Sequence, residues 1–62
     1  MTEIEEAILE LPPKLRSVIN LVCINKLEPA EAAKLEQCSI ATIYWRIHQS
    51  RKLLKQRLAE YL

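Results

Sequence analysis

Residues 39–62 read SIATIYWRIHQSRKLLKQRLAEYL, a run that contains neither Gly nor Pro. Its apolar side chains recur at steps of three, four and seven, which is the period of one helix face. Ser39 can accept a hydrogen bond from the free N–H groups of a first helical turn. The run therefore predicts one long amphipathic helix after Ser39. Its apolar face would consist of Ile40, Ile43, Ile47, Leu54, Leu58 and Tyr61.

The opposite face of this helix is polar and partly basic. A Trp in the middle of such an outward face is unusual. A helix that packs on the domain through its apolar face and exposes polar and basic groups on the other suits a protein that reads the DNA major groove. A bundle helix with a solvated outer face is the alternative, which this run taken alone favours. The outward residues are Ala41, Trp45, His48, Gln49 and Lys52.

The residues before the long helix predict a shorter helix and a tight turn. Pro29 fits the first helical position, where a missing N–H has little effect. Ala32 and Ala33 are small enough for another backbone to come close, and Leu35 is the expected apolar anchor. Residues 36–38 leave room only for a tight turn. Together the two helices make a helix-turn-helix.

Two more helices are predicted upstream. Thr2 and Glu5 have the T-x-x-E spacing of a capping box, and the helix that they begin should end before Pro12. A second helix is expected from about Pro13 to Ile24. We therefore expect an all-α fold, a small four-helix domain over residues 1–62 with a C-terminal helix-turn-helix. Its buried residues should include Ile19, Val22, Leu35, Ile40, Ile43, Ile47 and Leu54.

Leu21 and Ile24 fall on the side of the second helix that faces away from this core. They fit two interpretations equally well. One is a second small apolar cluster with the first helix, and the other is a docking patch for a protein partner.

Charge is unevenly distributed over the 62 residues. Through Glu36 there are seven acidic and four basic residues, a net of −3, whereas the remainder has five basic residues and one acidic residue, a net of +4. This asymmetry suggests a polyanionic partner at the C-terminal end.

Composition argues against an enzyme. The chain has one His, no Asp, no Gly-rich loop and no credible nucleophile–base pair, and no cofactor is predicted. Cys23 and Cys38 are expected as buried thiols in a reducing compartment, and a metal site built from them with His48 is a weak alternative. With no signal peptide and no long apolar run, we expect a cytoplasmic protein without membrane insertion.

Four segments together resemble region 4 of sigma-70-type transcription initiation factors, most closely the extracytoplasmic-function (ECF) branch. They are LPPKLR at 11–16, AAKL at 32–35, SIATI at 39–43 and RIHQSRKLL at 46–54. Each segment alone is a weak signal, but their order and spacing are fairly specific. The resemblance covers about fifty residues, which is nearly the whole chain.

The resemblance implies a function and a set of contacts. Such domains resemble four-helix units that read the promoter −35 element, dock on the β-flap of RNA polymerase and are bound by anti-sigma factors. It implies that Thr42 and Arg46 lie near the DNA backbone, and that Leu21 and Ile24 lie in the partner-docking region. The full predicted DNA-binding set, with Lys52 added from the outward face, is Thr42, Tyr44, Trp45, Arg46, His48, Gln49, Arg51 and Lys52.

The chain departs from the family pattern at several positions. Gln37 replaces the glycine often found in the turn, and Glu36 replaces an apolar residue on a partly buried face. Because an unpaired buried carboxylate is unfavourable, Arg46 or Arg51 is expected against Glu36. Tyr44, Trp45 and Gln49 also differ from the family's usual residues.

These departures leave alternatives open. One is a sigma-like interaction module, bound mainly to an anti-sigma factor or to polymerase, with weak or no DNA readout. Another is the output domain of a response regulator, which has a similar helix-turn-helix.

Overall fold

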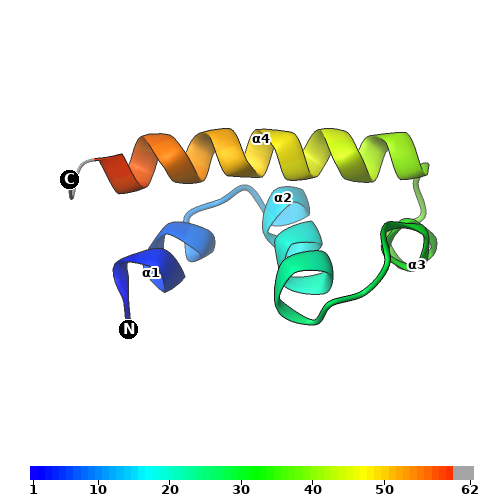
Figure 1. Ribbon diagram of the computed structural model, residues 1–62, viewed down its shortest axis with the longest axis horizontal. Coiled ribbons are helices and arrows are strands. Elements are labelled where there is room, and N and C mark those ends of the chain that lie inside the picture. The colour runs from blue at the N-terminus through cyan, green and yellow to red at the C-terminus, as the bar shows by residue number, and fades with distance from the viewer. Residues whose placement is uncertain (60–62) are drawn as a thin grey trace.

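The computed structural model describes residues 1–59, and this part of the chain is helical without any strand. The elements are α1 (Glu3–Leu9), α2 (Pro13–Val18), η1 (Ile19–Ile24), α3 (Pro29–Leu35) and α4 (Ile40–Leu58). The π-helix η1 continues directly from α2, so the two occupy the predicted second helix. In Figure 1, α4 lies across the other helices and contacts α1, α2 and α3. The predicted all-α fold with a C-terminal helix-turn-helix is confirmed.

N-terminal caps and first-turn prolines set the starts of these helices. Thr2 Oγ1 accepts a hydrogen bond from the Glu5 N–H at 3.2 Å, and Ser39 Oγ accepts one from the Thr42 N–H at 3.1 Å. Both hydroxyls satisfy donors that a first turn leaves free. Pro13 and Pro29 stand in the first turns of α2 and α3, as expected. These two caps and two prolines explain why the predicted starts agree with the structure.

The turn of the helix-turn-helix closes α3 with two backbone hydrogen bonds. The Cys38 N–H donates to the Ala33 carbonyl at 3.0 Å, and the Gln37 N–H donates to the Lys34 carbonyl at 3.3 Å. This pair is the Schellman motif, which needs a left-handed residue after the C-cap. Gln37 takes that conformation with φ 54°, at a position that favours glycine. The turn therefore keeps the geometry of a glycine turn without the glycine.

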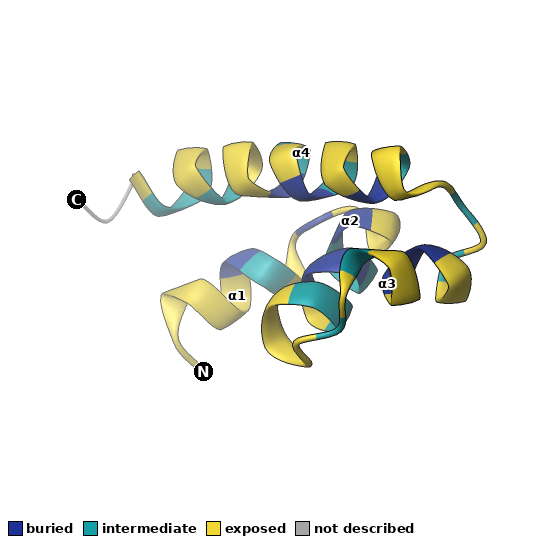
Figure 2. Ribbon diagram, turned by 45° about the vertical axis from the view of Figure 1, so that its right-hand side comes forward, coloured by how far each residue is buried: buried dark blue, intermediate teal, exposed yellow. Residues whose placement is uncertain are grey.

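The core consists of two apolar clusters beneath α4. Figure 2 shows the buried segments of α4 on the side that faces the other helices. The first cluster joins α2, α3 and α4. The second joins the segment after α1 to α2 and η1, with Ile8 of α1 and Leu54 of α4 packed against it. Their buried members are Val18, Ala32, Ala33, Ile43 and Ile47 in the first, and Leu11, Leu15 and Ile19 in the second.

Two predicted core residues are exposed, so that part of the core prediction is wrong. Leu35 is 62% exposed, because it is the last residue of α3 and points about a third of a turn away from the centre of the buried Ala32–Ala33 face. Ile40 is 45% exposed, because side chains tilt toward the helix N-terminus and Ile40 is the first residue of α4.

The remaining core predictions are met fully or in part. Ile19, Ile43 and Ile47 are buried, whereas Val22 and Leu54 are half-buried at the edges of the clusters. The predicted burial of Cys23 is also wrong. Cys23 is exposed and lies near the C-terminal end of η1, which is the end farther from α4 in Figure 1. Cys38 is half-buried. Tyr61 lies outside the described residues.

No helix among residues 1–59 combines the length and apolarity needed to cross a membrane.

Candidate nucleic-acid interface

The orientation of α4 follows from the residues that it buries. Ile43, Ile47 and Ser50 are buried against α2 and α3, so the side chains opposite them must face solvent. Trp45 is 60% exposed, and Tyr44, His48 and Lys52 are exposed as well. An exposed Trp on a helix anchored along its other face is available to a ligand or partner. The structure thus exposes four of the five predicted outward residues, Ala41, Trp45, His48 and Lys52, whereas Gln49 is half-buried.

The eight predicted DNA-binding residues fall into two groups. The exposed group is Tyr44, Trp45, His48, Arg51 and Lys52, and the half-buried group is Thr42, Arg46 and Gln49. The half-buried residues share one flank of α4, the side toward the turn and α2, because they are three and four positions apart. The Thr42 hydroxyl lies 3.0 Å from Ser39 Oγ and so takes part in the N-terminal cap.

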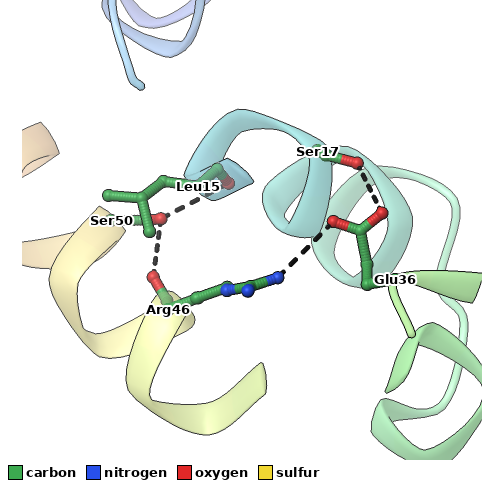
Figure 3. Close-up of polar contacts among 5 residues, drawn as sticks. All are labelled: Leu15, Ser17, Glu36, Arg46 and Ser50. Atoms are coloured by element: carbon green, nitrogen blue, oxygen red, sulfur yellow. Dashed lines mark hydrogen bonds and ion pairs between the residues drawn. The ribbon is translucent and has the colours of Figure 1, made fainter. Parts of the chain in front are cut away.

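Arg46 is held by an ion pair on that flank. Its Nη1 lies 3.8 Å from Glu36 Oε1, and the other carboxylate oxygen accepts a hydrogen bond from Ser17 Oγ at 3.1 Å (Figure 3). The expectation that an arginine lies against Glu36 is therefore confirmed, with Arg46 as the partner. Arg51 is exposed on the other flank. One carboxylate thus connects α2, the end of α3 and α4.

Ser50 is a structural residue that the sequence reading missed. It has no exposed surface, and its Oγ donates to the Arg46 carbonyl at 2.7 Å and lies 3.5 Å from the Leu15 carbonyl oxygen (Figure 3). Its place between Ile47 and Leu54 at steps of three and four was the available signal. A serine can occupy this apolar face because its hydroxyl bonds back to its own helix.

The basic charge of α4 lies mainly in its C-terminal half. Arg51, Lys52 and Lys55 are exposed there. Arg57 instead bonds Glu10 of the segment after α1, with Nε at 2.6 Å and Nη2 at 3.3 Å from the two carboxylate oxygens. Hydrogen bonding to Arg57 lowers the pKa of the Glu10 carboxyl below its ordinary value of 4.5. Arg57 therefore serves mainly to attach the N-terminal region to α4.

The predicted partner-docking pair is divided by the structure. Ile24 is 56% exposed, but Leu21 is half-buried against the first core cluster. Ile24 instead shares a shallow hollow between α1 and η1 with Ile8 and the exposed Leu9. Leu9 was missed by the sequence reading. The available apolar surface therefore combines Ile24 with α1 rather than with Leu21.

Within residues 1–59, no group of three or more His, Cys, Asp and Glu side chains is arranged to hold a metal ion.

Comparison with known proteins agrees with this geometry. The family model "Sigma-70, region 4" matches residues 1–54. The chain is 35% identical over 57 residues to the ECF RNA polymerase sigma factor SigW of Bacillus subtilis (strain 168), a match that covers 92% of this chain and 30% of that protein. The chain thus spans under a third of this relative's length, and no solved structure gives a significant match. On the matched residues and the helix-turn-helix fold, the chain belongs to the sigma-70 region 4 family.

Proposed function

We propose that this domain reads the promoter −35 element by placing α4 in the major groove. The observation that carries the proposal is the exposed face of Trp45, His48 and Lys52 on a helix whose opposite face is buried. Such a helix can enter the groove without disturbing the core. The role is non-enzymatic and belongs in the cytoplasm, where promoter DNA and RNA polymerase are found.

Different side chains would supply specificity and general affinity. Gln49 can pair with adenine through two hydrogen bonds, and Trp45 and Tyr44 can meet thymine methyl groups. Arg51 and Lys52 can bind phosphates, which position the protein without carrying sequence information. Two phosphate contacts correspond to a slope of about −1.8 in a plot of log affinity against log salt, at about −0.9 per contact.

Fluorescence anisotropy with duplexes selected from a random pool tests this assignment. Lys52→Ala should weaken binding to all duplexes alike and flatten the salt slope by about 0.9. Gln49→Ala should relax the preference at one base pair, a loss of about 1–3 kcal/mol of discrimination. Lys26→Asn is the matched control, because it removes one charge from the loop at the far side from α4 (Figure 1). Absence of binding to every duplex at low salt would exclude the DNA-reading function.

We further propose that the hollow formed by Leu9 and Ile24 docks on the polymerase β-flap, a surface for which an anti-sigma factor would compete. The support is that both side chains are exposed and line the hollow between α1 and η1. Ile24→Ser and Leu9→Ser should weaken binding to a β-flap fragment with little change in stability. Leu21→Ser should instead lower stability, because that side chain packs on the core. Unchanged binding by both exposed-site variants would reject this surface.

A sigma-like interaction module without DNA readout is the second candidate. It is favoured by the scarcity of bases in the first half of α4, where Arg46 is already paired. The anisotropy experiment above separates the two candidates, since the second predicts β-flap or anti-sigma binding without measurable DNA binding.

A further inference from the structure

Arg46 occupies a special place among the cations of α4. Between residues 40 and 50 it is the only Lys or Arg, and the exposed bases begin at Arg51. Recognition helices usually meet base edges through their N-terminal residues. Arg46 is therefore the arginine nearest to the part of α4 that would lie deepest in the groove, and its freedom to reach a phosphate bears directly on DNA affinity.

The structure shows Arg46 engaged elsewhere. Its side chain is 13% exposed, and its contact with Glu36 draws the guanidinium toward α2 (Figure 3). The Glu36 side chain, 19% exposed, is itself fixed by the hydrogen bond from Ser17. The carboxylate thus holds the arginine along the flank of α4, away from the outward face.

The Arg46–Glu36 ion pair has weaker geometry than the Arg57–Glu10 ion pair. Arg57 engages both oxygens of Glu10 at 2.6 and 3.3 Å, whereas Arg46 and Glu36 make one contact at 3.8 Å. Guanidinium groups bind oxyanions best through two parallel N–H donors. A phosphate that presents two oxygens can therefore compete with Glu36 for Arg46. Both side chains line an open hollow, and Lys14 supplies a second cation to its lining.

We propose that Glu36 competes with DNA phosphate for Arg46 and thereby lowers the affinity of the domain for every duplex. This inference rests on the proposed DNA-binding function. On the duplex, the guanidinium exchanges the carboxylate for a phosphate, while Ser17 continues to donate to Glu36. Because phosphate contacts carry no base information, the effect should be the same for all sequences.

Glu36→Gln tests the competition, because it removes the charge and keeps the shape of the side chain. The readout is anisotropy of the 62-residue chain with a labelled mixed-sequence duplex over a range of salt concentrations. The variant should bind about two- to tenfold more tightly at low salt, the range expected when one ion pair no longer opposes binding. Its salt slope should change by much less than about 0.9, because Arg46 neutralises the same phosphate in the wild-type and the variant complex.

Two controls separate competition from a general effect of charge. Glu31→Gln removes the same charge from an exposed position on α3 and should give a smaller gain. In an Arg46→Ala background, Glu36→Gln should give no gain beyond that of Glu31→Gln. Equal gains for the two Glu variants, or a gain that survives Arg46→Ala, would overturn the proposal.

The remaining outcomes are also decisive. If Lys52→Ala weakens binding but Glu36→Gln leaves the affinity unchanged, the competition is wrong and the DNA-binding function stands. If no variant binds any duplex, the function fails and the competition with it. Urea unfolding verifies that each variant is folded. Should Glu36→Gln not fold, Glu36→Leu supports the same comparison, because it restores the apolar residue of the family pattern.

Discussion

Ile43 lies at the centre of the first core cluster and has no exposed surface. Ile43→Ala should lower the free energy of unfolding by about 2–5 kcal/mol, because it removes buried contacts and leaves a cavity. Ile40→Ala is the matched control, since Ile40 lies on the same helix but is largely exposed. Urea unfolding followed by circular dichroism measures both. Similar losses for the two variants would contradict the core described here.

Individual residues were predicted well where one local rule applied. Thr2 and Ser39 cap helices as their spacing indicated, and Glu36 was assigned an arginine because a partly buried carboxylate needs a partner. The errors arose where tertiary geometry decides. Periodicity assigned Ile40 to the core, yet burial depends on whether another helix lies beneath it, and a helix end has less to cover it.

The turn of residues 36–38 sets the relation between α3 and α4. Gln37 holds a left-handed conformation that is unfavourable for a side chain with a Cβ atom. Gln37→Gly should therefore raise the free energy of unfolding by about 0.5–1 kcal/mol, after allowance for the greater freedom of Gly in the unfolded chain. Gln56→Gly, at an exposed position within α4, should instead lower the free energy of unfolding by about 1 kcal/mol. Destabilisation by both, measured by urea unfolding, would contradict the strained turn.

At the level of elements, the sequence predicted where helices start but not that η1 is a π-helix. Pro13, Pro29 and Ser39 mark starts through local chemistry. The π-helical geometry of η1, in which the Asn25 N–H donates to the Asn20 carbonyl at 2.9 Å, has no comparable signal in the sequence. The candidate DNA face was predictable because it depends on the period of one helix, whereas the Leu9–Ile24 hollow depends on how two elements meet.

Over the whole molecule, the Glu10–Arg57 pair joins the end of α1 to the C-terminal end of α4. Bonding to Arg57 lowers the pKa of Glu10 in the folded state below the ordinary 4.5. The folded state therefore resists protonation, so the pair contributes stability above the ordinary pKa and loses that contribution as pH falls through the lowered value. Glu10→Gln should be less stable than the wild type near neutral pH, and the difference should shrink in acid.

Urea unfolding at a series of pH values measures this difference. Glu3→Gln is the control, since that exposed residue is also acidic and lies on α1. A stability difference between wild type and Glu10→Gln that stays constant into acid would show that the carboxylate charge does not stabilise the pair.

The position of α4 as the helix on which α1, α2 and α3 all pack has a consequence for amide hydrogen exchange. The α4 residues Ile43, Ile47 and Ser50 are buried against α2 and α3, so their amides should exchange only when the entire domain opens. Those of α1 need only its release from α4, and they should exchange faster at the same pH. Native-state exchange should therefore resolve two classes of protection, with the slowest amides within the helix proposed to read DNA.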